Sequence, residues 1–193
     1  IDENGKIVNG DEILYILAKA NIDNPNFNSK IVGTVLSNTG LENCLNEINI
    51  ELHRADVGDK NVFRMMKSID SNLGGETSGH IIHHDYSPTG DGLLVALLVL
   101  KEAIKSKQPI SNLLKDLKLV SQTNINLEIK DIEVQDDLLK SIASRATEKL
   151  GNGRVLIRES GTEPLIRILI ESENKEKNDE VIEFINKEIS KKK

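Results

Sequence analysis

The sequence predicts two small layered domains, an α/β domain followed by an α+β domain. Up to about residue 118, short β-rich runs alternate with helical patterns, which is typical of an α/β layer. Beyond that point the order becomes strand, helix, strand, strand, helix. The chain has 193 residues, of which 38% are hydrophobic, and this is enough to bury a core in two small domains.

The first domain is expected to begin with a helix, a loop and a buried strand. Asn9 and Asp11 precede apolar residues at helical spacing, so one of them should cap a helix that ends near Ala20. Residues 21–30 are rich in Asn and contain a proline, which indicates a loop. Residues 31–36 form a short β-rich run, which predicts a buried strand.

Two further helices and a second strand follow, and then a longer helix. Residues 39–48 and 62–69 have helical apolar spacing, and residues 50–54 between them are β-rich. Residues 73–83 form a Gly-rich segment. Residues 91–105 are apolar around most of the helical circumference, which predicts a well-buried helix that Asp91 caps.

The second domain is expected to follow a linker at residues 119–124. Residues 125–129 alternate between apolar and polar, which predicts a half-exposed strand. The other expected elements are a helix that Gly151 ends, two strands and a charged amphipathic helix, at residues 138–150, 154–158, 165–170 and 175–192.

Composition excludes several classes of protein. The chain has 25 basic and 31 acidic residues, a net charge of −6, and only 3% aromatic residues. It is therefore a poor nucleic-acid binder, because phosphate contacts need Lys and Arg clusters and base stacking needs aromatic rings. The longest apolar run, residues 93–100, is too short to span a membrane, which takes ~20 residues.

The single cysteine and the N-terminus indicate the compartment and the extent of the chain. Cys44 excludes an intramolecular disulfide framework and a multi-Cys metal site, and its helical apolar surroundings predict a core residue. A cytoplasmic protein is expected. The acidic start is no signal peptide, and the missing Met is a first indication that the chain belongs to a longer one.

The sharpest motif is the run Arg-Glu-Ser-Gly-Thr-Glu-Pro at residues 158–164, between two expected strands. It offers a guanidinium fork, two hydroxyl donors and a glycine that lets backbone N–H groups converge, which suits a phosphate dianion. The alternative is a plain turn, since Ser, Gly and Pro all form turns. Arg154 and Arg167 flank the run and add positive charge, which favours the anion site.

A second motif, Gly-Gly-Glu-Thr-Ser-Gly-His, occupies residues 74–80. Its glycines allow close approach of a ligand to the backbone. Glu76 and Ser78 can hydrogen-bond sugar hydroxyls, and His80 can carry a proton near neutral pH. The alternative is a Gly-rich turn with a structural histidine.

Two weaker patterns have simpler explanations. Residues 56–60, Asp-Val-Gly-Asp-Lys, join a strand to a helix and could bind an anion, or Asp59 could simply cap the helix. His80, His83 and His84 suggest a metal site, but the adjacent pair points to opposite faces of an extended chain. We expect these two side chains at a strand end in solvent, and no metal ligand in this chain.

Taken together, these motifs resemble the C-terminal half of the phosphohexomutases. The resemblance spans nearly the whole chain and is far more specific than any one motif. The residues at positions 57–59 and 165–167 are similar to those of the branch that acts on glucosamine phosphates. The segments that carry it are residues 34–42 (Thr-Val-Leu-Ser-Asn-Thr-Gly-Leu-Glu), 57–59 (Val-Gly-Asp), 75–82 (Gly-Glu-Thr-Ser-Gly-His-Ile-Ile), 89–92 (Thr-Gly-Asp-Gly) and 158–167.

The resemblance implies a domain assignment. Members have four domains around one cleft. Residues 1–118 are expected to be the third domain, an α/β layer, with the tail end of the second at about residues 1–9. Residues 119–193 are expected to be the fourth domain, with a fold like that of the TATA-binding protein.

The resemblance also implies a reaction and a cofactor. In the glucosamine branch, glucosamine 6-phosphate and glucosamine 1-phosphate are interconverted on the route to the cell-wall precursor UDP-N-acetylglucosamine. A phosphoserine in the first domain donates its phosphoryl group and a bisphosphate intermediate forms. Mg²⁺ is held by an Asp-x-Asp-x-Asp-Arg loop in the second domain. This sequence has neither a Ser-His-Asn-Pro-type loop nor that acidic loop, so we expect it to be inactive alone, with Mg²⁺ bound outside it.

The implied roles of individual residues follow from the matched motifs. His80 is expected to transfer a proton or simply to hydrogen-bond, and Arg167 either binds phosphate or pairs with Glu163. The residues expected to grip the remote phosphate are Arg158, Ser160, Gly161, Thr162 and Arg167. Those expected to hold the sugar are Glu76, Ser78, Gly58 and Asp59.

The expected partners are a hexosamine phosphate and the N-terminal domains of the same enzyme, with a homo-oligomer possible and no nucleic acid or membrane. Two alternatives remain. One is a part of a phosphomannomutase or phosphoglucomutase, which keeps the chemistry and changes the sugar. The other is a non-catalytic sugar-phosphate-binding module.

Overall fold

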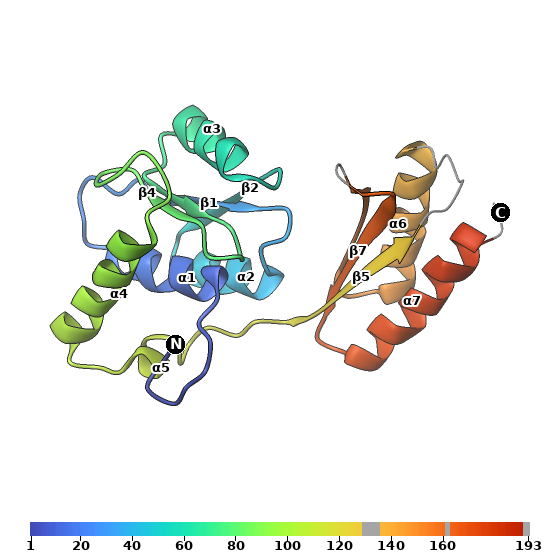
Figure 1. Ribbon diagram of the computed structural model, residues 1–193. Coiled ribbons are helices and arrows are strands. Elements are labelled where there is room, and N and C mark those ends of the chain that lie inside the picture. The colour runs from blue at the N-terminus through green and yellow to red at the C-terminus, as the bar shows by residue number, and fades with distance from the viewer. Residues whose placement is uncertain (129–135, 161–162, 191–193) are drawn as a thin grey trace. The chain divides into compact units, whose positions relative to one another are not determined.

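The computed structural model describes residues 1–128, 136–160 and 163–190. The chain divides into two compact units, which we call the N-terminal unit (Ile1–Leu119) and the C-terminal unit (Val120–Lys193). Each unit has its own sheet and its own apolar core (Figure 1). The fold class is as the sequence predicts, an α/β layer followed by a smaller α+β unit.

The sheet of the N-terminal unit is mixed. Its strands lie in the order β2 (Glu51–Ala55), β1 (Lys30–Thr34), β3 (Leu73–Gly75) and β4 (Ile81–His83). The first three run parallel, and β4 runs antiparallel to β3. The Gly-rich segment expected from the sequence is therefore a tight hairpin. Its strands are too short for an alternating pattern to reveal them.

Helices cover both faces of this sheet (Figure 1). The helices α1 (Gly10–Ala20) and α2 (Thr39–Glu47) share one core with the sheet, and α4 (Gly92–Ser106) packs against α1 and β4. The opposite face carries α3 (Asp59–Ile69), which has a smaller core of its own. A short helix, α5 (Ile110–Leu113), follows α4.

The starts of α1 and α4 have side-chain caps that the sequence predicts. The Asn9 side chain accepts a hydrogen bond from the Glu12 amide at 3.0 Å, and the Glu12 carboxylate accepts one from the Asn9 amide at 2.8 Å. This capping box shows that Asn9, and not Asp11, caps α1. Asp91 caps α4 by accepting a hydrogen bond from the Leu94 amide at 3.0 Å.

The strand β1 ends two residues earlier than expected. The Thr34 amide donates to the Ser37 hydroxyl at 3.0 Å, and the Ser37 amide donates to the Thr34 carbonyl at 2.9 Å. Thr34 and Ser37 are buried in this turn, and Val35 and Leu36 are partly buried, so the sequence beyond Thr34 stays apolar although the strand has ended.

The burial predicted for α4 is wrong. The helix lies where the pattern places it, but only Val95 and Val99 are buried in the core. Leu93 and Ile104 are 74% and 77% exposed. An apolar pattern around a helix does not say what covers each face, so the sequence could not separate the two sides.

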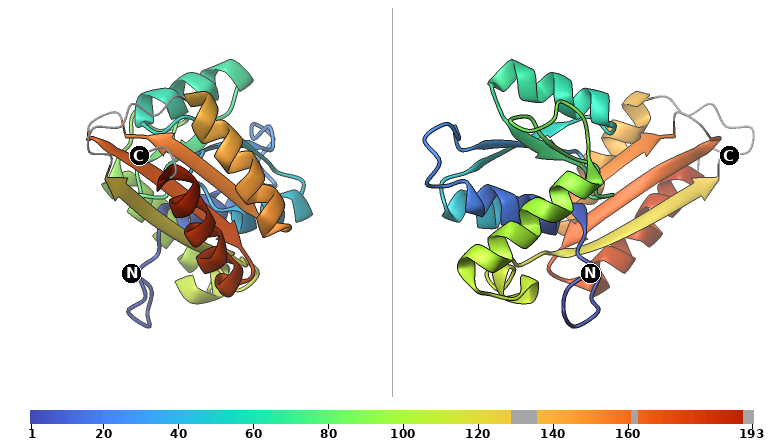
Figure 2. Two further views of the ribbon diagram at one scale, coloured as in Figure 1. Left: turned by 90° about the vertical axis from the view of Figure 1, so that its right-hand side faces the viewer. Right: turned by 60° about the vertical axis from the view of Figure 1, so that its left-hand side comes forward.

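The C-terminal unit is a three-stranded antiparallel sheet with two helices on one face (Figure 2). The strand order is β5 (Ser121–Glu128), β7 (Leu165–Ser172), β6 (Arg154–Glu159). The helices α6 (Asp136–Leu150) and α7 (Lys175–Ser190) pack their apolar sides on β6 and β7. The linker expected at residues 119–124 is wrong, because β5 occupies most of it and pairs along its whole length with β7.

Two smaller predictions concern Cys44 and membranes. Cys44 is a free, buried thiol in α2, as its apolar setting predicts. Among the described residues, every helix is too short or too polar to cross a lipid bilayer.

Candidate functional site

The motifs of the N-terminal unit converge on one edge of its sheet. Because β1, β2 and β3 are parallel, their carboxyl ends lie on the same edge. The loops that follow them are residues 35–38, 56–58 and 76–80, and α2 and α3 begin directly after the first two. The start of α1 lies here too, since the Gly10 amide donates to the Thr77 carbonyl at 2.9 Å.

Glu76 joins two of these loops. Its Oε1 accepts a hydrogen bond from the Gly58 amide at 2.9 Å, and its Oε2 lies 4.0 Å from His80 Nδ1. The Glu76 side chain is 14% exposed, so the carboxylate is mostly withdrawn from water yet reaches the surface. The two sequence motifs that contain Gly58 and Glu76 are thus parts of one cradle.

His80 and Ser78 stand at the open side of this cradle. The Ser78 hydroxyl lies 3.1 Å from His80 Nδ1, and the imidazole is 70% exposed. Gly79 between them has a φ of +97°, a conformation that favours glycine and turns the backbone back toward β4. The histidine is therefore oriented on one nitrogen and accessible to a ligand.

A buried carboxylate that the sequence offered only as a possible helix cap, Asp11, holds the loops of the cradle in place. Asp11 is 1% exposed, and its two oxygens accept hydrogen bonds from the Asn38 amide at 2.9 Å and the Thr77 hydroxyl at 3.2 Å. The available signal was the complete capping box of Asn9 and Glu12. Asn9 and Glu12 satisfy the helix start by themselves, so the carboxylate of Asp11 is not needed as a cap and can bond elsewhere.

The approach of α1 to this loop demands glycine at position 10. A Cβ atom built on Gly10 would lie 1.9 Å from the Glu76 carbonyl oxygen and 2.9 Å from the Gly79 nitrogen. Both are backbone atoms, so no side chain could yield. The loop is thus packed directly on the helix start.

The expected helix cap at Asp59 is replaced by a different arrangement. Gly58 is the cap residue, with a φ of +118° and no side-chain cap bond. Asp59 is exposed, and its carboxylate accepts a hydrogen bond from the Lys60 amide at 2.7 Å. A hollow of about 280 Å³ opens beside this loop, lined by Ala55, Asp56, Asn61, Arg64, Met65 and Ser68.

The adjacent histidines lie in different environments. His83 is 4% exposed and packs edge-on against the Tyr86 ring, so the prediction that it lies in solvent is wrong. His84 is exposed and contacts the Phe63 ring. Burial lowers the pKa of His83 below its ordinary value. Among the described residues, no three His, Cys, Asp or Glu side chains are grouped as metal ligands.

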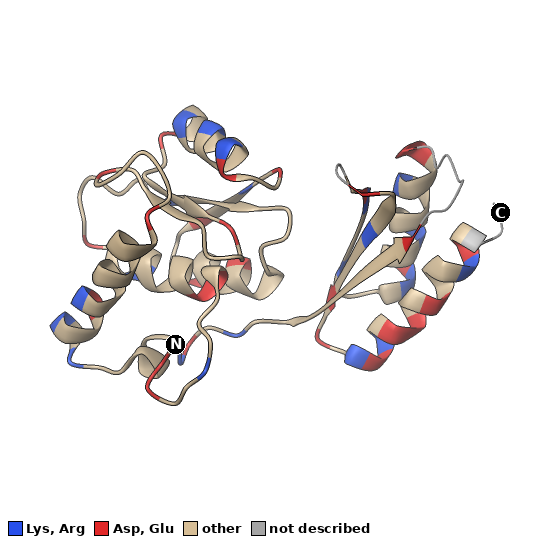
Figure 3. Cartoon of the chain, in the orientation of Figure 1, with Lys and Arg blue, Asp and Glu red and all other residues tan. Residues whose placement is uncertain are grey.

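In the C-terminal unit, two arginines face each other across the strands. Arg158 on β6 is the direct partner of Arg167 on β7. Their neighbours Ile157 and Ile166 are buried against the helices, so by alternation both arginines lie on the other face of the sheet. Figure 3 colours the basic positions along the strands of this sheet blue. Like charges directly opposite each other are unfavourable by themselves, and two guanidinium groups so close together form a positive surface that can attract an anion.

The loop beside this pair has unused hydrogen-bond capacity. The Ser160 hydroxyl oxygen and Arg167 Nε are shielded from solvent and have no hydrogen-bond partner among the described residues. Arg167 Nη2 pairs with the Glu163 carboxylate at 3.0 Å. Gly161 and Thr162, which the sequence assigns to the same phosphate site, lie outside the described residues.

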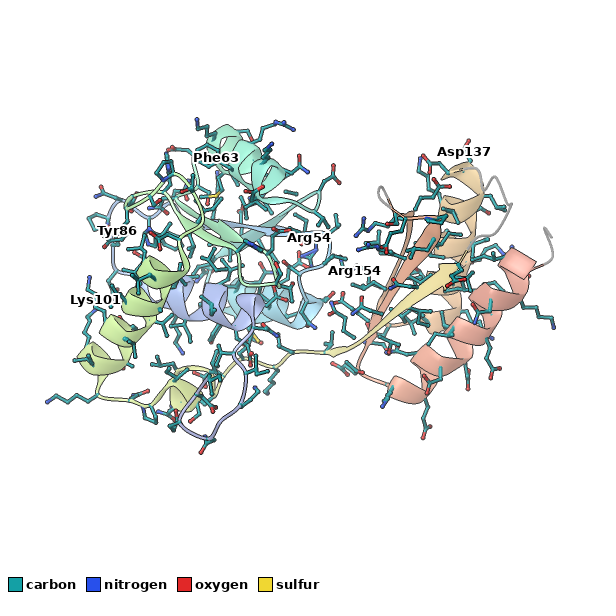
Figure 4. All side chains as sticks on the ribbon, in the orientation of Figure 1. Arg54, Phe63, Tyr86, Lys101, Asp137 and Arg154 are labelled. Atoms are coloured by element: carbon teal, nitrogen blue, oxygen red, sulfur yellow. The ribbon has the colours of Figure 1, made fainter. Side chains whose placement is uncertain are left out.

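Arg154 has a different role from the one expected. It begins β6, at the opposite end of that strand from the loop (Figure 4). Its Nε and Nη2 lie 2.7 and 2.6 Å from the Glu171 carboxylate, which is fully buried and also accepts a hydrogen bond from Gln122 at 2.9 Å. The charge of Arg154 is therefore used within the sheet, and the prediction that it strengthens the anion site is wrong.

Comparison with known proteins places both units in one family. Residues 9–119 match the family model described as phosphoglucomutase/phosphomannomutase, alpha/beta/alpha domain III. Residues 123–188 match the model of the C-terminal domain of the same family. Both matches agree with the resemblance seen in the motifs.

Named relatives are similar over nearly the whole chain. It is 38% identical to phosphoglucosamine mutase 2 of Shewanella frigidimarina, over 98% of this chain and 43% of that protein. It is 40% identical to the phosphoglucosamine mutase of Natranaerobius thermophilus, over 99% of this chain and 44% of that protein. The chain thus spans less than half the length of these relatives.

Solved structures share the fold. The N-acetylphosphoglucosamine mutase of Aspergillus fumigatus superposes with a TM-score of 0.77 at 16% identity, covering 94% of this chain and 43% of that one. A phosphoglucomutase/phosphomannomutase family protein of Burkholderia thailandensis gives 0.76 at 20% identity, covering 96% and 42%.

Proposed function

The chain belongs to the phosphoglucomutase/phosphomannomutase family, and we propose that it is the sugar- and phosphate-binding part of a phosphoglucosamine mutase. The full-length protein would interconvert glucosamine 6-phosphate and glucosamine 1-phosphate through a phosphoserine and a bisphosphate intermediate. The names of the similar relatives support this substrate. The observation that carries the proposal is the opposed pair Arg158 and Arg167 beside a loop with unused hydrogen-bond capacity.

The C-terminal unit would bind the phosphate that does not react. A dianion between Arg158 and Arg167 would accept hydrogen bonds from both guanidinium groups, and Ser160 lies directly after Arg158 and Glu159 on the same side of the loop's start. Gly161 and Thr162 complete the proposed set. Because this phosphate is remote from the bond being made, its binding energy positions the reacting hydroxyl at the phosphoserine.

The N-terminal unit would hold the sugar ring. Ser78 is exposed for a hydrogen bond with a ring hydroxyl, and the Glu76 carboxylate lies at the edge of the same cradle. Gly58 and Asp59 would line the cradle on its α3 side. His80, oriented on Nδ1 by Ser78, is the group proposed to give or take the proton of the attacking oxygen.

The divalent metal that the family resemblance implies is assigned to polypeptide outside this chain. The described residues contain no grouping of three His, Cys, Asp or Glu side chains suited to hold it. No step proposed here passes through the metal. The same reasoning predicts that the purified 193-residue chain has no mutase activity, and turnover by it would contradict the proposal. The full-length enzyme is proposed to be cytoplasmic.

The direct test is Arg158→Ala in the full-length protein. A hydrogen bond to a charged group contributes ~1.5–3 kcal/mol, so KM for the sugar phosphate should rise about tenfold or more. Arg145→Ala is the matched control, because Arg145 lies on α6 and pairs with Glu188 at 2.7 Å, outside the proposed site. An unchanged kcat/KM in Arg158→Ala would remove the phosphate site from the proposal.

The choice of sugar needs a separate measurement. The family description includes phosphoglucomutases and phosphomannomutases, so the phosphates of glucose and mannose are the competing substrates. Competition among the three sugar phosphates on the full-length enzyme should favour glucosamine phosphate. Preference for glucose or mannose phosphate would keep the reaction and change the substrate. Sugar-phosphate binding by the full-length protein without turnover would favour the non-catalytic module.

A further inference from the structure

The sheet of the C-terminal unit carries two matching rows of polar side chains on the face opposite α6 and α7 (Figure 2). A row is one residue from each of β5, β7 and β6 in direct register. The rows lie four residues apart along each strand, which is about 13 Å. In the order β5, β7, β6, the first row is Gln122, Glu171 and Arg154, and the second is Asn126, Arg167 and Arg158.

The first row shows how the two outer strands bind an anion that lies over the central one. The Glu171 carboxylate on β7 accepts a hydrogen bond from the Gln122 side-chain amide at 2.9 Å. Arg154 Nε and Nη2 lie 2.7 and 2.6 Å from the same carboxylate. Glu171 is fully buried, so these donors take the place of its water. An amide of β5 and an arginine of β6 thus converge on one negative charge.

The second row repeats the outer positions of the first and changes the central one. Asn126 supplies the side-chain amide on β5, and Arg158 supplies the arginine on β6. The central residue is Arg167, so none of the three residues is acidic. Its Nη2 pairs with Glu163 at 3.0 Å, while its shielded Nε has no hydrogen-bond partner among the described residues. The second row therefore has the donors of the first row without an anion of its own.

The side chain of Asn126 points toward this row. Its neighbours Ile125 and Leu127 pack on the core beneath the helices, so by alternation Asn126 lies on the face that carries the arginines. It is exposed, and its amide offers two N–H donors. Direct cross-strand partners have Cβ atoms about 4.5–5.5 Å apart, so one phosphate group can contact both Asn126 and Arg167.

We infer that Asn126 is a further phosphate-binding residue, and that its side-chain amide donates a hydrogen bond to the anion proposed to lie between Arg158 and Arg167. The inference rests on the proposed function, because it takes that anion to be the phosphate that does not react. A neutral amide adds a donor to the site without adding to the repulsion between the two guanidinium groups.

The test titrates inorganic phosphate into the 193-residue chain and follows the side-chain Nε–H signals of Arg158 and Arg167 by NMR. Asn126→Ala should raise the Kd for phosphate about tenfold or more, because a hydrogen bond to a charged group is lost. Asn124→Ala is the matched control and should leave the Kd unchanged. Asn124 is exposed on the same face of β5, but the residues in register with it are Leu169 and Leu156.

A second pair of variants tests the same contact through charge. Asn126→Asp places a carboxylate directly opposite Arg167, where it competes with phosphate for the guanidinium groups, so the Kd should rise further than in Asn126→Ala. Asn124→Asp adds the same charge about 7 Å away along the strand and should have a smaller effect. Hydrogen exchange of the β7 amides reports whether the sheet is intact in each variant.

The outcomes separate the inference from the proposed function. Weaker phosphate binding in both Asn126 variants, with unchanged exchange of the β7 amides, supports the inference. Unchanged binding in Asn126→Ala overturns it and leaves the proposed function standing. Weaker binding that comes with faster β7 exchange assigns Asn126 to the fold of the sheet and also overturns it.

Two further results concern the unmodified proteins. If the unmodified chain binds no phosphate, the inference fails together with the proposed phosphate site. If Asn126→Ala weakens phosphate binding with native β7 exchange but the full-length protein has no mutase activity, the proposed function fails and the role of Asn126 in binding the anion stands.

Discussion

The sites proposed for the two units are built in opposite ways. The N-terminal unit uses backbone groups at a sheet edge, and the carboxylates of Asp11 and Glu76 fix these loops through the Asn38 and Gly58 amides. The site proposed for the C-terminal unit uses side chains on strands, and it centres on two like charges that face each other, Arg158 and Arg167. The proposed N-terminal site has its loops fixed without a ligand. In the proposed C-terminal site, a bound anion would balance the positive charge of the arginine pair.

This difference suits the proposed reaction. A phosphate group is the same chemical object at either end of a sugar, so a charge-based grip accepts both orientations of the bisphosphate. Ring hydroxyls differ between the two orientations, so they need donors and acceptors held at fixed positions. The contrast predicts that the N-terminal site is sensitive to backbone changes and the C-terminal unit to charge changes.

The largest expected effect tests charge inside the C-terminal sheet. Glu171→Ala leaves Arg154 without its buried partner, and breaking such a pair costs about 3 kcal/mol of unfolding free energy, at the low end because Arg154 is 27% exposed. Hydrogen exchange of the β7 amides in the 193-residue chain measures it, since two units do not unfold as one transition.

The matched control is the second Arg–Glu pair of this unit. Glu163→Ala removes the pair with Arg167, whose side chains are 55% and 41% exposed, and should cost less than about 1 kcal/mol. Equal costs for Glu171→Ala and Glu163→Ala would show that the Arg154 pair is no more important to the sheet than a surface pair.

The next effect tests backbone packing in the N-terminal unit. Gly10→Ala places a methyl group 1.9 Å from the Glu76 carbonyl, which forces the loop away and should cost ~1–3 kcal/mol. In the full-length enzyme, KM for the sugar phosphate should rise because Ser78 and His80 move with the loop. Gly92→Ala is the control, since nothing lies within 4 Å of its Cβ position. A Gly10→Ala enzyme with native kinetics would show that the cradle is not the sugar site.

The smallest effect is a pH dependence confined to the N-terminal unit. All four histidines lie there, and burial lowers the pKa of His83 below its ordinary 6.5. As the pH falls below about 6.5, His83 becomes protonated in the unfolded chain while it stays neutral in the folded unit. The unfolding free energy of this unit should therefore fall. The loss ends below the lowered pKa, where both states are protonated.

Two variants isolate this contribution. His83→Gln should flatten the stability profile between pH 7 and the acid limit, measured by exchange of the β3 and β4 amides. His84→Gln, at an exposed neighbouring position, should leave the profile as it is. The idea fails if His83→Gln keeps the full acid loss.

Much of the fold was predictable because local signals agreed with it. Asn9, one of the two expected caps of the first helix, and the cap at Asp91 define helix starts that the structure confirms. The hairpin of β3 and β4 was not predictable, because each strand has three residues and its glycines carry no pattern. The exposed side of α4 was not predictable either, because an apolar residue pattern is the same whether that side of the helix is buried or exposed.

The candidate site was predictable as residue types and only partly as geometry. The motifs contain Glu76, Ser78 and Arg158. The sequence could not show, however, that the Glu76 carboxylate accepts a hydrogen bond from the Gly58 amide of another motif. Asp11 was missed because its partners, Asn38 and Thr77, are 27 and 66 residues away. Arg154 was misassigned because it lies only a few residues before the loop in sequence, but an extended strand separates the two in space.

The opposed arginines have a consequence for ionic strength. This chain carries a net charge of −6, so it would repel the proposed sugar-phosphate dianion at long range and attract it near Arg158 and Arg167. Added salt screens beyond about 8 Å at physiological ionic strength, which removes the long-range repulsion first. Modest salt should therefore speed the encounter with substrate, and high salt should shorten the residence of the phosphate on the arginine pair.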